Sequence, residues 1–219
     1  MLSANAIVNL QDSLTRAWHL EAEIGEAESP TGGGASKSAT GPGAAKVWLS
    51  SVARHHRANF ELWHIEDEAR APGASDAVVA GVKRRIDRTN QLRNDQTEEL
   101  DRALLDWLAP QALPAPQSPL HSESPGLMID RLSILALKIF HTREEAERAS
   151  APDGHEERNR DRLAILEEQR ADLAACLDSL WRETLAGTRR FKIYRQLKMY
   201  NDPSLNPAIY GSQRQDAGR

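Results

Sequence analysis

The chain has 219 residues, of which 40% are apolar and 27% charged, and its formal net charge is −4. This length and apolar content exclude wholesale disorder, the single cysteine excludes a disulfide scaffold, and the slightly acidic balance disfavours nucleic acid as a partner. No apolar run approaches the about 18–20 residues that span a bilayer, and residues 1–14 lack the pattern of a signal peptide. We therefore expect a cytoplasmic protein with no membrane insertion.

Apolar residues recur at intervals of three and four along most of the chain, which is typical of amphipathic helices. They predict helices over about 3–24, 46–70, 76–108, 125–148 and 153–186, and a short basic helix over 188–200. The short break around Gly73 predicts that the second and third helices form a central antiparallel hairpin. The expected fold is therefore an all-α bundle of about five or six helices.

The domain organisation follows from the segments between these helices. Residues 28–45 are rich in Gly, Ser and Ala and predict a flexible loop, whereas residues 109–124 are rich in proline and predict an extended linker. We expect one helical domain over 1–211 and a disordered tail over 212–219.

Polar residues occupy positions where the core stripes of the second and third helices should be apolar. On the second helix the stripe contains the polar residues His56, Asn59, Glu66 and Arg70 together with Trp63. On the third helix the polar residues are Lys83, Asp87, Asn90, Arg93, Asn94 and Thr97. Burying an unpaired polar group costs a few kcal/mol, so such a stripe needs a reason. It predicts either a hydrogen-bonded network between helices or a cleft for a polar ligand or metal ion.

The hairpin geometry suggests which polar residues meet. With the turn centred near Gly73, Asn59 would lie opposite Asp87, His56 near Asn90, and Glu66 near Lys83. The acidic residues at 61–68 and those at 98–101 would then lie some 27 Å apart along the hairpin. They could not share one magnesium ion, which needs oxygen ligands at about 2.1 Å.

Two further regions carry candidate binding residues. On the fourth helix Asp130 and Lys138 lie among apolar neighbours. The segment 188–200 contains basic and aromatic residues but no acid, and a turn at Asn201 follows it. Such a segment could cap the bundle and pair with its acidic helices, or it could bind phosphate and sugar groups.

The histidines give no metal site by sequence spacing. His55 and His56 lack the further ligands that zinc requires. We expect His19, His121 and His155 to lie at helix edges or in loops, with no specific role. No metal ligand is therefore predicted.

Four blocks of the sequence, NFELWHIEDEAR (59–70), VKRRIDRTNQLRNDQTEELD (82–101), PGLMIDRLSILALKI (125–139) and RRFKIYRQLKMYNDPSLNPAIYG (189–211), resemble a bacterial family of unknown function, DUF4254. The resemblance implies a cytoplasmic helical protein of a kind often encoded beside glycosyltransferases of lipopolysaccharide and surface-glycan assembly. It implies no mechanism.

Sugar-nucleotide or phosphosugar binding or processing is the function that these features favour. Catalytic or sugar-binding carboxylates would be Glu66, Asp87 and Asp130. The other expected ligand-binding residues are His56, Asn59, Trp63, Arg70, Lys83, Asn90, Asn94, Lys138, Arg190, Tyr194, Arg195, Lys198 and Asn201.

Two alternatives stay open at this point. One is a nucleotide pyrophosphohydrolase that uses magnesium, and the other is a non-enzymatic scaffold for a glycosyltransferase. Self-association into a homo-oligomer is also compatible with the long leucine-bearing helices.

Overall fold

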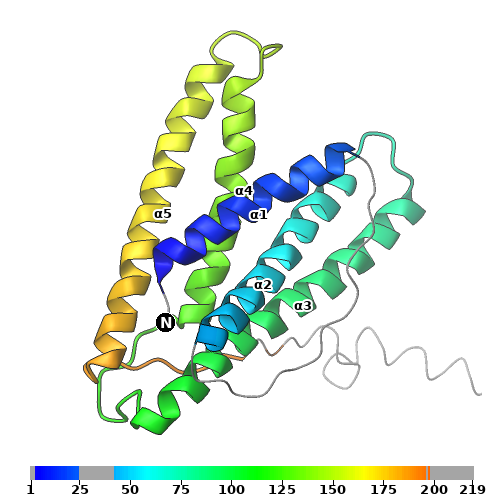
Figure 1. The fold of residues 1–219 in the computed structure, drawn as a ribbon. Helices are drawn as coiled ribbons and strands as arrows, with labels where there is room; N and C mark the ends of the chain where they lie inside the picture. Colours follow the sequence, from blue (N-terminus) through cyan, green and yellow to red (C-terminus); the bar gives the residue numbers. More distant parts are fainter. Residues whose placement is uncertain (1–2, 25–41, 196, 198–219) are drawn as a thin grey trace, which may run out of the picture.

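The computed structural model describes residues 3–24, 42–195 and 197. This part of the chain contains the helices α1 (Ala4–Ile24), α2 (Pro42–Glu68), α3 (Asp76–Leu108), α4 (Pro125–Glu147) and α5 (His155–Leu185), with a 3₁₀ turn, η1 (Ala109–Gln111). Its β-structure amounts to one isolated bridge, between Leu120 and Arg190. The expected all-α bundle with a central helical hairpin is confirmed (Figure 1).

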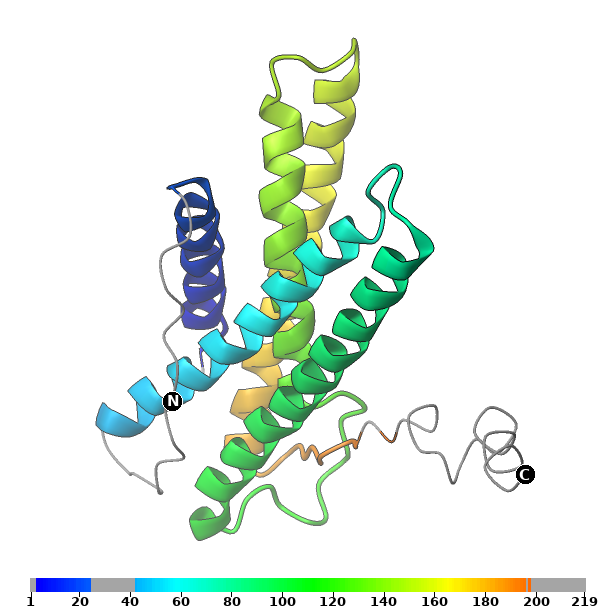
Figure 2. The ribbon, with the colours of Figure 1, turned by 90° about the vertical axis from the view of Figure 1, so that its right-hand side faces the viewer.

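Two antiparallel hairpins, α2–α3 and α4–α5, make up most of the bundle, and α1 lies across both (Figures 1 and 2). Helix α4 packs against each of the other four α-helices, and α1 packs against α2, α4 and α5. None of the described helices is long and apolar enough to cross a membrane.

The helix ends are explained by their local sequence. Ser75 and Ser124 cap α3 and α4, each accepting a backbone hydrogen bond in the first turn, and Pro125 begins α4 with its φ already suited to a helix. Gly187, at φ 72°, ends α5 in the left-handed conformation that a glycine adopts at low cost.

The start of α4 is anchored on α3 by Asp101, which is 2% exposed. Its carboxylate accepts hydrogen bonds from the Ser124 hydroxyl and, at 2.6 Å, from the Gly126 backbone N–H. Burial raises the pKa of Asp101 to about 6, against the opposing effect of these two bonds. The approach is so close that a Cβ at Gly126 would lie 2.6 Å from the Thr97 carbonyl oxygen.

The core lies where α4 meets its neighbours. A main apolar cluster joins all five helices, and its fully buried members include Ile7, Leu100, Ile129, Leu132 and Leu177. A smaller cluster of Ile65, Val82 and Ile86 packs α2 against α3 near the turn that joins them. The polar features described below lie between and beside these clusters.

The predicted basic helix over 188–200 is wrong for the residues that are described, because 188–195 are not helical. Arg190 instead uses its backbone N–H and C=O to bond Pro119 and His121, and Phe191 is buried in the main core. These backbone groups are the ones that a helix would need. Lys198, Asn201 and the tail 212–219 lie outside the described residues.

The predicted loop over 28–45 is wrong at its end, since α2 already begins at Pro42. Proline has no N–H to lose in a first helical turn, so it suits this position. Residues 28–41 lie outside the described part of the chain.

Candidate functional site

A buried polar network joins α2, α3 and α4 around the carboxylate of Asp130. Its Oδ1 atom lies 3.0 Å from His55 Nε2, accepts a hydrogen bond of 3.0 Å from Asn59 and lies 3.6 Å from Arg93 Nε. Burial alone would raise the pKa of Asp130, but His55, Arg93 and Asn59 outweigh it and lower the pKa. The carboxylate is therefore held ionised by its partners.

A second part of this network surrounds His56, which is fully buried. Its Nδ1 lies 2.7 Å from Ser133 Oγ and its Nε2 lies 2.9 Å from Thr15 Oγ1. Since the Thr15 hydroxyl donates to the Gln11 carbonyl, it accepts from Nε2–H, and Ser133 donates to Nδ1. Burial, followed by the nearby His55, lowers the pKa of His56 to about 3. The ring is neutral and both of its nitrogens are paired.

The predicted pairing across the hairpin is wrong. Asn59 binds Asp130 rather than Asp87, because α4 covers this face of α2. The register is also shifted, since Arg54 pairs with Glu99 and Arg85 with Glu68. The two acidic clusters have separate partners, since Glu99 pairs with Arg54 and Glu68 with Arg85, and the shifted register makes their separation shorter than the roughly 27 Å predicted.

The other predicted site residues do not gather around Asp130. Glu66 pairs with Arg70 and Asp87 with Lys83, in each case within one helix and at the surface. Lys138 and Arg195 are exposed, whereas Asn94 is buried and Asn90 and Tyr194 are half-buried. The Arg190 side chain donates to the Ser118 carbonyl at 2.8 Å and so holds the C-terminal segment in place. The three predicted carboxylates thus each have their own partners.

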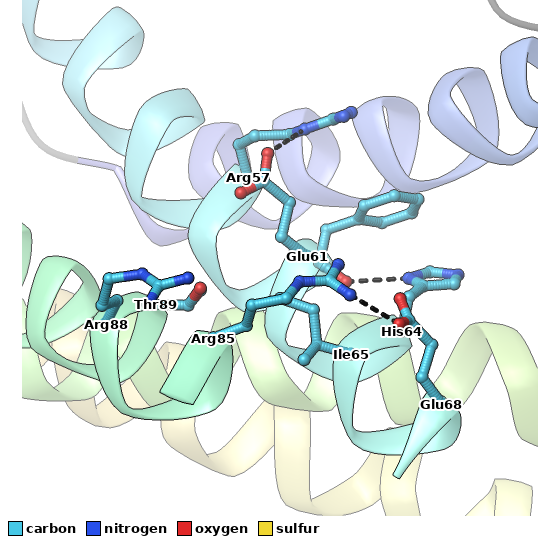
Figure 3. A pocket seen from close by; sticks show the side chains of 9 residues that line it. Arg57, Glu61, His64, Ile65, Glu68, Arg85, Arg88 and Thr89 are labelled. Carbon is cyan, nitrogen blue, oxygen red and sulfur yellow. Dashed lines mark hydrogen bonds and ion pairs between the residues drawn. The ribbon is translucent and has the colours of Figure 1, made fainter. Parts of the chain in front are cut away.

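A groove between α2 and α3 lies on another face of the hairpin (Figure 3). It has a volume of about 430 Å³ and is lined by Arg57, Phe60, Glu61, His64, Ile65, Glu68, Arg85, Arg88 and Thr89. Three arginines and two glutamates give this lining a net charge of +1 in an acidic chain. We call it the arginine groove.

Two of the three arginines in this groove are already paired. Arg57 contacts Glu61 at 2.9 Å and Arg85 contacts Glu68 at 2.5 Å, while Arg88 has no ion-pair partner among the described residues. A guanidinium without a carboxylate partner is a candidate donor to an oxyanion. Arg88 is therefore the candidate anion donor of this groove, whereas Arg57 and Arg85 would first have to leave their glutamate partners.

Three histidines meet where α1, α2 and α4 converge, and we call them the histidine trio. His19, His64 and His141 each offer one ring nitrogen within 4.8 Å of the others. Among the described residues, this is the one group of three or more His, Cys, Asp or Glu side chains so placed. Its ligands are nitrogen atoms, which suit zinc and other transition metals rather than magnesium.

Comparison with known proteins gives one result. Residues 49–193 match the family described as protein of unknown function (DUF4254). The chain belongs to this family. No curated protein and no solved structure matches the chain. The DUF4254 match covers the arginine groove and most of the buried network, while His19 on α1 lies outside it.

The sequence interpretation of this DUF4254 chain missed both the groove and the trio. A signal for the groove existed: Arg57, Glu61, His64 and Glu68 follow one another at helical spacing and so share one face of α2. The trio has no such signal, because its members come from three helices. Only the packing of α1 on α2 and α4 brings them together.

Proposed function

We propose that this protein binds a phosphorylated sugar or a nucleotide sugar in the arginine groove. The observation that carries the proposal is the mixed lining, with guanidinium groups and carboxylates in one concave site. Guanidinium groups pair with phosphate oxygens, and carboxylates accept hydrogen bonds from sugar hydroxyls. A ligand that has both kinds of group matches both kinds of lining residue.

The size of the groove supports the same class of ligand. Sites for small molecules commonly have volumes of about 300–1,000 Å³, and this groove has about 430 Å³. If a phosphate displaced Glu68 from Arg85 or Glu61 from Arg57, the released carboxylate could turn to a sugar hydroxyl. The Thr89 hydroxyl adds a neutral donor and acceptor.

The biological setting is part of the proposal. The family resemblance points to the assembly of bacterial surface polysaccharide such as lipopolysaccharide, in the cytoplasm and beside a glycosyltransferase. Binding a phosphorylated sugar would suit a protein that delivers a substrate to such an enzyme or modifies it.

Calorimetric titration of chelator-treated protein with a panel of nucleotide sugars and sugar phosphates tests the proposal. We expect at least one of them to bind, and Arg88→Gln to weaken it about tenfold or more, the equivalent of one charge-assisted hydrogen bond. Arg84→Gln is the matched control, because Arg84 is an exposed arginine of the same helix that does not line the groove. No binding by any compound, or equal losses in both variants, would refute the proposal.

A second candidate function is metal-dependent hydrolysis of the bound phosphate ester or anhydride. It is favoured by one observation: His64 lines the arginine groove and also belongs to the histidine trio. Release of phosphate or pyrophosphate from nucleotides, measured with and without added zinc, would test it. Turnover that survives His64→Gln unchanged would exclude this candidate.

A further inference from the structure

We propose that the histidine trio, His19 with His64 and His141, binds a zinc-like transition-metal ion that ties α1 to α2 and α4. This proposal does not depend on a ligand in the arginine groove. It rests on how the three rings are hydrogen-bonded, on what surrounds them and on which nitrogen each ring has left.

The hydrogen bonds of the trio determine its tautomers. His19 Nδ1 lies 2.7 Å from the Thr15 carbonyl oxygen, and His64 Nδ1 lies 2.8 Å from the Phe60 carbonyl oxygen. Carbonyl oxygens can only accept, so both Nδ1 atoms carry the proton. With the proton on Nδ1, the second nitrogen of each ring, Nε2, is the one available to a metal ion.

His141 has the same arrangement with a carboxylate as its acceptor. Its Nδ1 lies 2.8 Å from Glu144 Oε2, which again requires the proton on Nδ1. Metal-binding histidines generally donate their second N–H to a carbonyl or carboxylate in this way. All three members of the trio thus have the outer hydrogen bond that orients a metal ligand.

The nitrogens that remain are buried without partners in two of the three rings. His19 Nε2 and His141 Nε2 are inaccessible to solvent and have no hydrogen bond. A buried polar atom without a partner destabilises the folded chain, because it has lost its hydrogen bonds to water. Two such atoms within one cluster of three histidines indicate a place for a cation that accepts nitrogen ligands.

Aromatic rings surround the trio, whose three histidines are half-buried. The His19 ring stacks on Phe140 and contacts Phe60 edge-on, and the Trp63 ring stacks on His141 with an interplanar angle of 10°. Burial, with His19 and His64 nearby, lowers the pKa of His141 despite Glu144. This lowering favours the neutral ring, which is the form that binds a metal ion.

The ligand set selects the kind of metal. Three imidazoles with room for a further ligand are typical of zinc and related ions, with metal–nitrogen distances of about 2.0–2.1 Å. Tetrahedral ligands at that distance are about 3.3 Å apart, whereas the trio nitrogens lie within 4.8 Å of one another. Binding thus requires small side-chain rotations that draw the three rings together.

Cobalt titration tests this proposal, because Co²⁺ replaces Zn²⁺ and absorbs visible light when it has nitrogen ligands. We expect untagged, chelator-treated protein to bind one Co²⁺ per chain with visible absorption that Zn²⁺ abolishes. His64→Gln and His141→Gln should weaken binding by more than the about 10- to 100-fold expected for an outer-shell change, and Glu144→Gln should fall within that range. His121→Gln, at a histidine outside the trio, should bind as the parent chain does.

Circular dichroism of each variant identifies any that fail to fold, and His141→Phe, which retains the stacking on Trp63, then replaces His141→Gln. Absence of cobalt absorption in the parent chain, or absorption that His121→Gln removes as fully as His64→Gln, would overturn the proposal. The titration contains no sugar or nucleotide and the calorimetric titration contains no metal. Failure of one proposal is therefore distinguishable from failure of the other.

Discussion

Two histidine-containing regions lie within a few turns of one another on α2, and they differ in how their polar atoms are paired. Around His56 and Asp130, every charged group has a partner inside the bundle, and the single open ring nitrogen is His55 Nδ1. In the trio, each ring is held at Nδ1, while the Nε2 atoms of His19 and His141 have no partner. The first arrangement pairs its charged groups within the bundle and leaves single, separate nitrogen atoms such as His55 Nδ1 and Arg93 Nε without a hydrogen bond. The second leaves two ring nitrogens of one histidine cluster without a partner.

The largest expected change in the free energy of unfolding follows removal of the Asp130 carboxylate at the centre of the network. Asp130→Ala leaves His55 and Asn59 buried without their acceptor and should lower the free energy of unfolding by about 3–5 kcal/mol. Urea unfolding measures it. Asp95→Ala, at an exposed acid of α3, is the control and should stay within about 0.5 kcal/mol of the parent chain. Equal losses at both positions would show that the network carboxylate contributes no more to the free energy of unfolding than an exposed acid does.

The second prediction concerns the pH dependence that His56 gives to stability. Because its pKa is lowered from 6.5 to about 3, the unfolded chain takes up a proton in a range where the folded chain does not. Stability from His56 is complete above about pH 6.5 and is lost as the pH falls towards 3.

We therefore expect the unfolding free energy of the parent chain to fall by roughly 2 kcal/mol more than that of His56→Gln between about pH 6.5 and pH 5. The comparison removes the opposite contribution of Asp101, whose raised pKa adds stability as the pH falls through about 6. Parallel pH profiles for the two proteins would mean that His56 is not buried in its neutral form.

The sequence predicted two polar residues of α2 that are buried in the network, but it did not predict which residues they bond to. The polar stripe on α2 correctly indicated that His56 and Asn59 would be buried, since such residues at core spacing have no other place to go. Their partners could not be predicted, because a hairpin model of α2 and α3 omits α4, which supplies Asp130 and Ser133.

The C-terminal segment shows a different limit. Residues 188–195 have helix-compatible spacing, but the backbone bonds of Arg190 to Pro119 and His121 and the burial of Phe191 outweigh it. Local spacing cannot report a contact with a loop some seventy residues earlier, so tertiary packing decides the conformation.

In protein without metal, the third prediction is that substitution in the trio changes the free energy of unfolding much less than substitution in the network. His141→Phe removes a buried nitrogen that has no partner and retains the stacking on Trp63. The substitution also removes the hydrogen bond from His141 Nδ1 to the exposed Glu144, which contributes little to stability, so the unfolding free energy should change by no more than about 1 kcal/mol. A loss as large as that of Asp130→Ala would mean that the trio is a structural network as well.

The smallest effect is expected at the surface of α3. Lys83 and Asp87 form an exposed pair one helical turn apart, so Lys83→Gln should change the unfolding free energy by no more than about 0.5 kcal/mol. The same variant should bind nucleotide sugars as the parent chain does, because Lys83 does not line the arginine groove. A marked loss of ligand binding would instead show that Lys83 contributes to the binding site.

Thermal unfolding with and without added zinc compares the two regions in one experiment, using the parent chain, His141→Phe and His56→Gln. Zinc that binds only the folded chain raises the melting temperature by mass action. We expect that rise in the parent chain and in His56→Gln, whose trio is intact, and no rise in His141→Phe. No rise in the parent chain, or an equal rise in all three proteins, would contradict a metal site at the histidine trio.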